Sequence, residues 1–240
     1  MVTDFNNSNT NTRDSAPLSR AEQFFEVSVF LFLIVPSMAL SFFAIKQGTL
    51  SFVLVAISVI LRDLALVSLI LFFIWRNHEP VTRIGWTLKN SRKEIALGIL
   101  LFIPFTFGTA LLEKSLQALG LSVPSTPLPS FLTARGMGEF LLASVLVVIV
   151  ALAEETIFRG YLLLRFKTLT ANPTAAVLLS AVVFSIGHGY EGSAGVVTVG
   201  VMGAVFALVY LWRRSLVAPM VMHFLQDFLG IVLLPLLGKT

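Results

Sequence analysis

Long apolar runs separated by short polar stretches make up most of the chain. The runs lie at about residues 24–43, 52–75, 95–112, 139–166, 174–188, 196–212 and 216–234. A helix needs about 20 predominantly apolar residues to cross the hydrocarbon core of a bilayer, and most of these runs approach or exceed that length. The pattern predicts an all-α, polytopic transmembrane helix bundle of about seven spans, and a count of six or eight also fits it.

The first 23 residues differ from the rest of the chain. They are rich in Asn, Thr and Ser and contain no apolar run, so we expect a disordered polar N-terminal tail at 1–23 rather than a signal peptide. We divide the remainder into N-terminal transmembrane helices and loops, 24–134, and a second helix bundle, 135–236, which carries most of the ionisable groups within the apolar runs.

Composition supports a membrane protein. The chain is 56% hydrophobic and 12% charged, whereas a soluble domain carries about 25% charged residues. It has no cysteine, which excludes a disulfide framework, a thiolate metal site and a cysteine nucleophile. We expect a multi-pass protein of a bacterial plasma membrane or an organellar membrane, with the lipid bilayer as its surroundings.

The net charge of +4 does not indicate a nucleic-acid partner, because loop Lys and Arg in a membrane protein record its orientation. The stretches 76–93, 159–167 and 213–214 are basic and are interpreted as loops. The positive-inside rule places them and the N-terminus in the cytoplasm.

Glu154, Glu155 and Arg159 interrupt the apolar run that begins near 139. Each charge at the centre of a membrane helix costs roughly 2.5–3.5 kcal/mol, so these groups need compensation. Glu155 and Arg159 are four residues apart and can pair, while Glu154 lies about 100° further around the helix. Glu154 is therefore a candidate general base, and the alternative is a structural ion pair that joins two helices.

Two histidines on later runs are further candidates. His188 follows Phe184 by one helical turn, and His223 precedes Asp227 by the same spacing, which lets the carboxylate orient the imidazole. The structural alternatives are an interfacial histidine and a polar pair that bridges helices. Carboxylates and imidazoles that converge from three spans suit activated-water chemistry, so the sequence indicates hydrolysis of an amide.

Two mechanisms fit these groups. In the first, Glu154 with His188 deprotonates a water, and His223, oriented by Asp227, donates a hydrogen bond to the oxyanion. In the second, Glu154, His188 and His223 bind zinc and leave an open position for water. The chain has no HExxH motif, so spacing gives zinc no independent support and no cofactor is assigned.

Arg62 and Asp63 lie in the middle of the second apolar run. Neighbours in sequence do not face each other on a helix. We therefore expect each to find a partner on another helix, or the helix to break there.

The motifs EExxxR, FxxxH and HxxxD occur in this order on successive hydrophobic helices, as Glu154-Glu155…Arg159, Phe184…His188 and His223…Asp227. In this they resemble the CAAX protease and bacteriocin-processing (CPBP, or Abi) family of intramembrane proteases. The resemblance covers about residues 135–235. It implies an α-helical membrane endopeptidase whose catalytic set is Glu154, His188, His223 and Asp227, with Glu155 and Arg159 in support.

Members of this family have been described both as metalloproteases and as glutamate-dependent proteases, and eukaryotic relatives remove the last three residues of prenylated CAAX proteins. The family carries Asn or Asp at the last motif position. An ionised Asp cannot donate a hydrogen bond, so Asp227 is interpreted as the orienter of His223. The resemblance implies a membrane-associated protein or peptide as substrate.

Two other functions remain open. One is a non-catalytic membrane scaffold or immunity protein of the same fold, and the other is a proton-coupled transporter. Simple alternation of spans places Glu154 near the cytoplasmic end of its helix and His188 near the outer end of the next. The two can meet if the helix of Glu154 continues past Arg159, or if the span that ends at His188 is offset or broken, and the continuation is the arrangement we predict.

Overall fold

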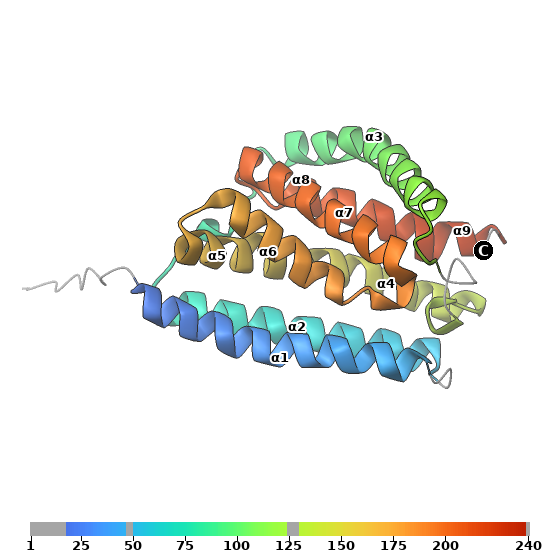
Figure 1. The fold of residues 1–240 in the computed structure, drawn as a ribbon, viewed down its shortest axis with the longest axis horizontal. Helices are drawn as coiled ribbons and strands as arrows, with labels where there is room; N and C mark the ends of the chain where they lie inside the picture. Colours follow the sequence, from blue (N-terminus) through green and yellow to red (C-terminus); the bar gives the residue numbers. More distant parts are fainter. Residues whose placement is uncertain (1–17, 47–49, 124–129, 239–240) are drawn as a thin grey trace, which may run out of the picture.

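The computed structural model of the chain describes residues 18–46, 50–123 and 130–238 (Figure 1). Its longer helices are α1 (Arg20–Lys46), α2 (Phe52–Arg76), α3 (Ser91–Ala118), α4 (Gly136–Glu154), α6 (Pro173–Ile186), α7 (Gly192–Arg213) and α8 (Val217–Asp227). Shorter pieces join or extend them: η1 (Val81–Ile84), η2 (Ser130–Leu132), η3 (Glu155–Leu162), α5 (Leu163–Thr170), η4 (Gly189–Glu191), η5 (Phe228–Leu233) and α9 (Leu234–Leu236). Over these residues the fold is helical and contains no strand, which confirms the predicted all-α bundle.

The start of the chain is described only in part. Residues 1–17 of the predicted polar tail lie outside the described residues. The first helix begins at Arg20, earlier than the predicted start at Phe24.

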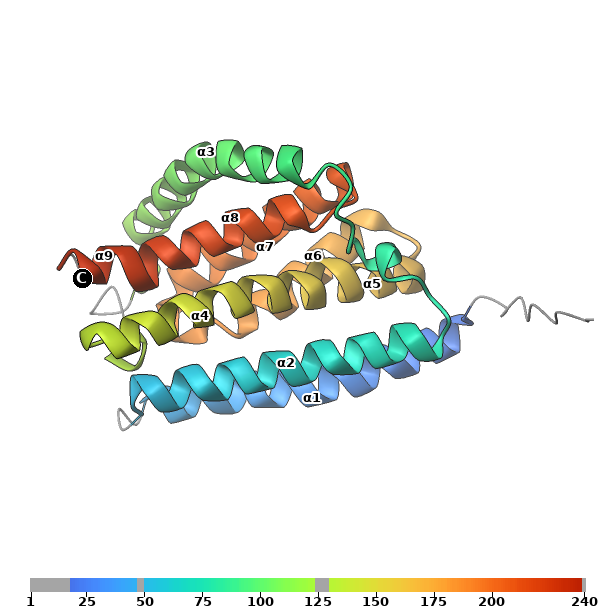
Figure 2. The same cartoon turned by 180° about the vertical axis from the view of Figure 1, so that it is seen from behind.

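The helices run roughly along one direction and stack in layers (Figures 1 and 2). α2 packs on α4, α6 packs on α7, and α3 covers α8 on the far side of the bundle from α1. Large apolar side chains also point outward, such as Phe32 and Phe107, which are 76% and 75% exposed. Such apolar side chains suit contact with lipid. The helices that carry them can lie in lipid because each satisfies its own backbone hydrogen bonds. The chain is a multi-pass integral membrane protein.

Six helical stretches are long and apolar enough to cross a membrane in the described part of the chain. The predicted span that is not among these six, at 174–188, corresponds to α6, which has 14 residues and is therefore only about 21 Å long. His188 follows directly after this short helix, so it lies deeper in the bundle than the end of a full-length span.

α4, η3 and α5 form one continuous helical stretch of 35 residues, Gly136–Thr170. The predicted continuation past Arg159 is thus confirmed, and Glu154 lies near the middle of the stretch. η3 is π-helical, with hydrogen bonds that skip one residue more than in an α-helix. π-helical turns are rare and occur frequently at functional sites.

The same continuity corrects the interpretation of 159–167 as a loop. These residues are helical, and Arg165 is fully buried rather than exposed to solvent. Its Nη2 lies 2.9 Å from a carboxylate oxygen of Glu79 and 3.3 Å from one of Glu26. Arg165 therefore ties α5 to α1 and to the segment after α2, and its charge is balanced inside the protein.

The segment after α2 folds back onto η3. Trp86 Nε1 donates a hydrogen bond to Thr156 Oγ1 at 3.0 Å, and Gly85 O accepts one from the backbone of Leu216 at 3.1 Å. At Gly160 the two backbones approach so closely that an added Cβ would lie 2.7 Å from Ile84 O. These contacts fix the segment after α2 against η3 and against the start of α8.

Candidate active site

Glu155 and Arg159 lie at the centre of the bundle, and both side chains are fully buried. Glu155 Oε1 is 3.0 Å from Arg159 Nη1, so the predicted pair is present. The same oxygen lies 2.8 Å from Nδ1 of His223 on α8. Because an ionised carboxylate only accepts, Nδ1 of His223 is the donor in this bond, and Nε2 is directed toward the other groups of the site.

Aromatic rings enclose the rest of the Arg159 guanidinium. Its carbon lies 4.2 Å from the centre of the Phe184 ring and 5.2 Å from that of Phe206. A cation held over aromatic faces in this way is stabilised by roughly 0.5–2 kcal/mol. Phe184 also contacts both candidate imidazoles, with ring centres 5.1 Å from His188 and 6.0 Å from His223.

Two more carboxylates lie near Nε2 of His223. Asp227 Oδ2 is 3.4 Å away and Glu154 Oε2 is 3.8 Å away. The two adjacent glutamates therefore meet opposite nitrogens of one imidazole, because they project from different sides of their helix. Glu155 makes a shorter contact with His223, 2.8 Å, than Asp227 does, 3.4 Å, so both carboxylates lie close enough to orient this imidazole.

The expectation for Arg62 and Asp63 is partly wrong. α2 continues without a break, and the two neighbouring side chains pair with each other at 2.8 Å. The long side chain of Arg62 can bend toward the short side chain of Asp63 even though their Cα–Cβ bonds diverge. The predicted contact with another helix is also present, since Arg62 Nη2 lies 4.0 Å from Glu154 Oε1 on α4.

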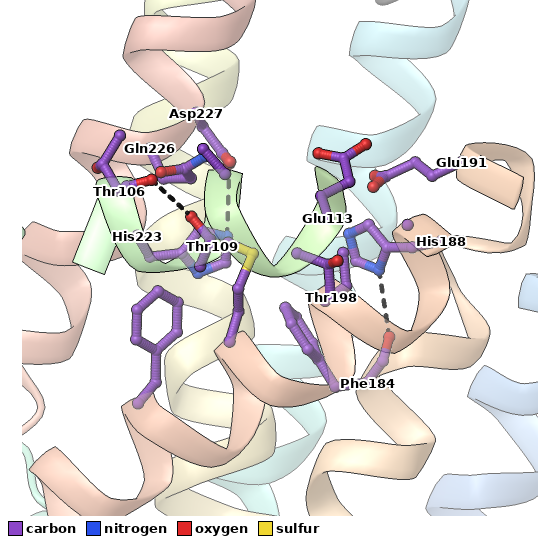
Figure 3. Close-up of a pocket in the computed structure, with 15 residues that line it drawn as sticks. Thr106, Thr109, Glu113, Phe184, His188, Glu191, Thr198, His223, Gln226 and Asp227 are labelled. Atoms are coloured by element: carbon purple, nitrogen blue, oxygen red, sulfur yellow. Dashed lines mark hydrogen bonds and ion pairs between the residues drawn. The ribbon is translucent and has the colours of Figure 1, made fainter. Parts of the chain in front are cut away.

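His188 lies at the other end of a cavity of about 260 Å³ that His223 and Asp227 also line (Figure 3). Its Nδ1 is 3.2 Å from the carbonyl oxygen of Phe184. A carbonyl oxygen only accepts, so Nδ1 is the donor in this contact and Nε2 is the nitrogen left to meet other groups. Within the described residues, His188 makes no hydrogen bond to Glu154, so their predicted joint action on a water stays a prediction.

The three predicted zinc ligands do not form a ligand set here. No three His, Asp or Glu side chains among the described residues are arranged to hold a metal ion. Zinc requires its ligand atoms at about 2.0–2.2 Å from one point. Nδ1 of His188 and Nδ1 of His223 are already engaged by a carbonyl and by Glu155, so only their Nε2 atoms are available.

Several groups of the site were not identified from the sequence. Thr106, Thr109 and Glu113 of α3 line the cavity, as does Glu191 beyond His188 (Figure 3). A signal for the α3 residues does exist, because spacings of three and four place all three on one face of an otherwise apolar helix. Glu191 carries no such signal, since its approach to α3 depends on the folded structure.

A polytopic membrane helix bundle with a buried cluster of carboxylates and imidazoles at mid-membrane is typical of an intramembrane enzyme, since charged groups there are costly and seldom retained without function. Residues 136–229 match the family described as Type II CAAX prenyl endopeptidase Rce1-like. The match confirms the resemblance to the CAAX protease family for this part of the chain and supports intramembrane protease activity in general. Comparison with curated proteins and with solved structures gives no match.

Proposed function

We propose that this protein is an intramembrane endopeptidase that hydrolyses a peptide bond of a membrane-associated protein or peptide through a water activated by Glu154. The observation that carries the proposal is the environment of the Glu154 carboxylate. Glu154 Oε2 is buried, has no hydrogen-bond partner among the described residues, and lies 3.8 Å from His223 Nε2. This separation is too long for a direct hydrogen bond and suits a bridging water.

The reaction follows from these groups. Glu154 accepts a proton from the water as its oxygen attacks the carbonyl carbon, and the carbonyl becomes an oxyanion. Doubly protonated His223 donates from Nε2 to the oxyanion, while Nδ1 keeps its bond to Glu155. Glu154 then passes its proton to the amide nitrogen as the C–N bond breaks. The products are a carboxylic acid and an amine.

Glu155 and Arg159 act in this scheme through His223. The buried guanidinium keeps Glu155 as an acceptor, and Glu155 fixes which nitrogen of His223 faces the reacting atoms. His188 lies across the cavity and positions the substrate, with the lone pair of Nε2 available to an amide N–H. A prenylated CAAX-type protein is the substrate class that the family description suggests.

The test uses the full chain in proteoliposomes with membrane-anchored peptides, prenylated and unprenylated, and detects products by mass spectrometry. Glu154→Gln keeps the shape of the side chain but removes the base, so we expect cleavage to fall by about 100-fold or more. Glu139→Gln is the matched control and should keep wild-type cleavage, because Glu139 is on the same helical stretch and, among the described residues, bonds to the backbone of Arg135 rather than to the site.

Equal cleavage by wild type and Glu154→Gln would refute the assignment of the base. A wild-type protein that cleaves none of the peptides, although folded, would instead favour the non-catalytic scaffold. Thermal unfolding of each variant in detergent distinguishes loss of chemistry from loss of fold.

A further inference from the structure

A second ion pair lies within a membrane helix, on α2. Arg62 and Asp63 are near the middle of this 25-residue helix, and Asp63 is only 1% exposed. Charged groups at such a depth are costly and seldom retained without function. α2 precedes the residues that match the family, 136–229, so the match assigns no role to this pair.

Asp63 holds the guanidinium of Arg62 in one orientation. Arg62 Nε donates to Asp63 Oδ1 at 2.9 Å, and Nη2 lies 2.8 Å from the same oxygen. Two contacts from one planar guanidinium restrict its rotation, whereas a single contact leaves it free to turn. In the described part of the chain, no other Lys or Arg lies within ion-pair distance of Asp63.

The same guanidinium faces the base of the proposed reaction. α2 and α4 lie side by side (Figure 2), and Arg62 Nη2 is 4.0 Å from Glu154 Oε1. The other oxygen of this carboxylate, Oε2, is 3.8 Å from His223 Nε2. Because the two oxygens belong to one rigid plane, the position of Oε1 beside Arg62 sets how Oε2 faces the imidazole.

The way Asp63 pairs differs from that of an ion pair away from the site. Both oxygens of Glu94 on α3 accept from Arg213 Nε, at 3.2 and 3.3 Å. Asp63 instead uses Oδ1 for both contacts with Arg62, and its Oδ2 is buried without a hydrogen-bond partner among the described residues. A buried acceptor left unpaired is costly. The arrangement therefore directs the guanidinium of Arg62 rather than satisfying both groups fully.

We propose that Asp63 is a positioning residue of the active site, which acts through Arg62 on Glu154. This inference rests on the proposed function, because it assigns a role toward the base of that reaction. Asp63 fixes the guanidinium, and the guanidinium holds Glu154 Oε1. Glu154 Oε2 is thereby kept at the distance from His223 that suits a bridging water.

The experiment measures kcat and KM for the membrane-anchored peptides in proteoliposomes, and thermal unfolding of each variant in detergent. Asp63→Ala should lower kcat about threefold to tenfold with KM unchanged, because Arg62 loses the acceptor that directs it. Asp63→Asn should lose less, because its amide oxygen can still accept from Arg62.

A double-mutant cycle tests whether Asp63 acts through Arg62. Once Arg62→Gln is present, Asp63→Ala should cause no further loss of kcat, because the group that it positions is already gone. This double variant leaves neither charge of the pair behind, so it also remains informative where Asp63→Ala alone is poorly folded.

Glu94→Ala is the matched control, because it removes a buried carboxylate from the pair with Arg213, away from the site. It should lower the unfolding midpoint and keep the wild-type kcat. The same result for Asp63→Ala would overturn the proposal, since the pair would then be structural only. A change confined to KM, or an equal loss of kcat with and without Arg62→Gln, would also overturn it. Absence of any cleavage by wild type would instead be a failure of the proposed function.

Discussion

Neutralising Glu155 tests whether the buried charges at the centre of the bundle depend on each other. In Glu155→Gln, the amide oxygen can still accept from His223 Nδ1, so the hydrogen bond seen at 2.8 Å is retained in kind. The variant removes only the negative charge 3.0 Å from Arg159 Nη1. Arg159 is fully buried and has no other carboxylate within 4.0 Å among the described residues. The perturbation is therefore a single uncompensated cation.

The magnitude follows from the distance and the burial. Two unit charges 3.0 Å apart interact by roughly 5 kcal/mol at an effective dielectric constant of about 20. Breaking one partner of a buried pair typically costs about 3–5 kcal/mol, which agrees with this figure. The stacking of Arg159 on Phe184 is the same in the variant and in wild type, so it does not reduce the loss of stability. We expect the free energy of unfolding to fall by about 3–5 kcal/mol.

Thermal unfolding in detergent, followed by tryptophan fluorescence, measures the effect, and the midpoint should fall on the order of 10 °C. Adding Arg159→Met removes the stranded cation and should recover most of the loss, because replacing both partners of a buried pair is often neutral. Glu94→Gln is the control: its partner Arg213 is one-third exposed, so water can hydrate the freed charge and the loss should stay near 1 kcal/mol. A Glu155→Gln protein as stable as wild type, or a double variant no better than the single one, would refute the reasoning.

Two further predictions concern α2 and the π-helical segment. Arg62→Gln should lower kcat about tenfold with KM unchanged, because the cation 4.0 Å from Glu154 Oε1 positions the base. Arg62→Lys keeps the cation and should restore most of kcat, and a parallel change in KM would contradict this role. Gly160→Ala should destabilise the protein by about 1–3 kcal/mol in thermal unfolding, because the new Cβ would lie 2.7 Å from Ile84 O. The control Gly108→Ala should be neutral or slightly stabilising, because its Cβ meets nothing within 4 Å. Equal stability of the two variants would argue against the close backbone approach at Gly160.

Much of the fold could be predicted from the sequence. The apolar runs predicted the long helices within a few residues at most ends, because crossing a bilayer requires a length of apolar chain that few other structures need. The continuation of the helix past Arg159 was also predicted, from the need to bring Glu154 toward the level of His188. What failed was the interpretation of Arg165 as a loop residue, since its buried partners Glu79 and Glu26 are distant in sequence.

The sequence by itself determined that this is a membrane helix bundle and that Glu154, Glu155 and Arg159 lie within one of its apolar runs, since hydrophobic length and the cost of a charge in lipid are local properties of the chain. Only the tertiary structure decided which of the ionisable side chains contact each other. Glu155 rather than Asp227 makes the short bond to His223, Arg62 approaches Glu154, and Glu113 reaches the cavity of His188. Such contacts depend on how separate helices pack and rotate against one another, which the spacing along a single helix does not record.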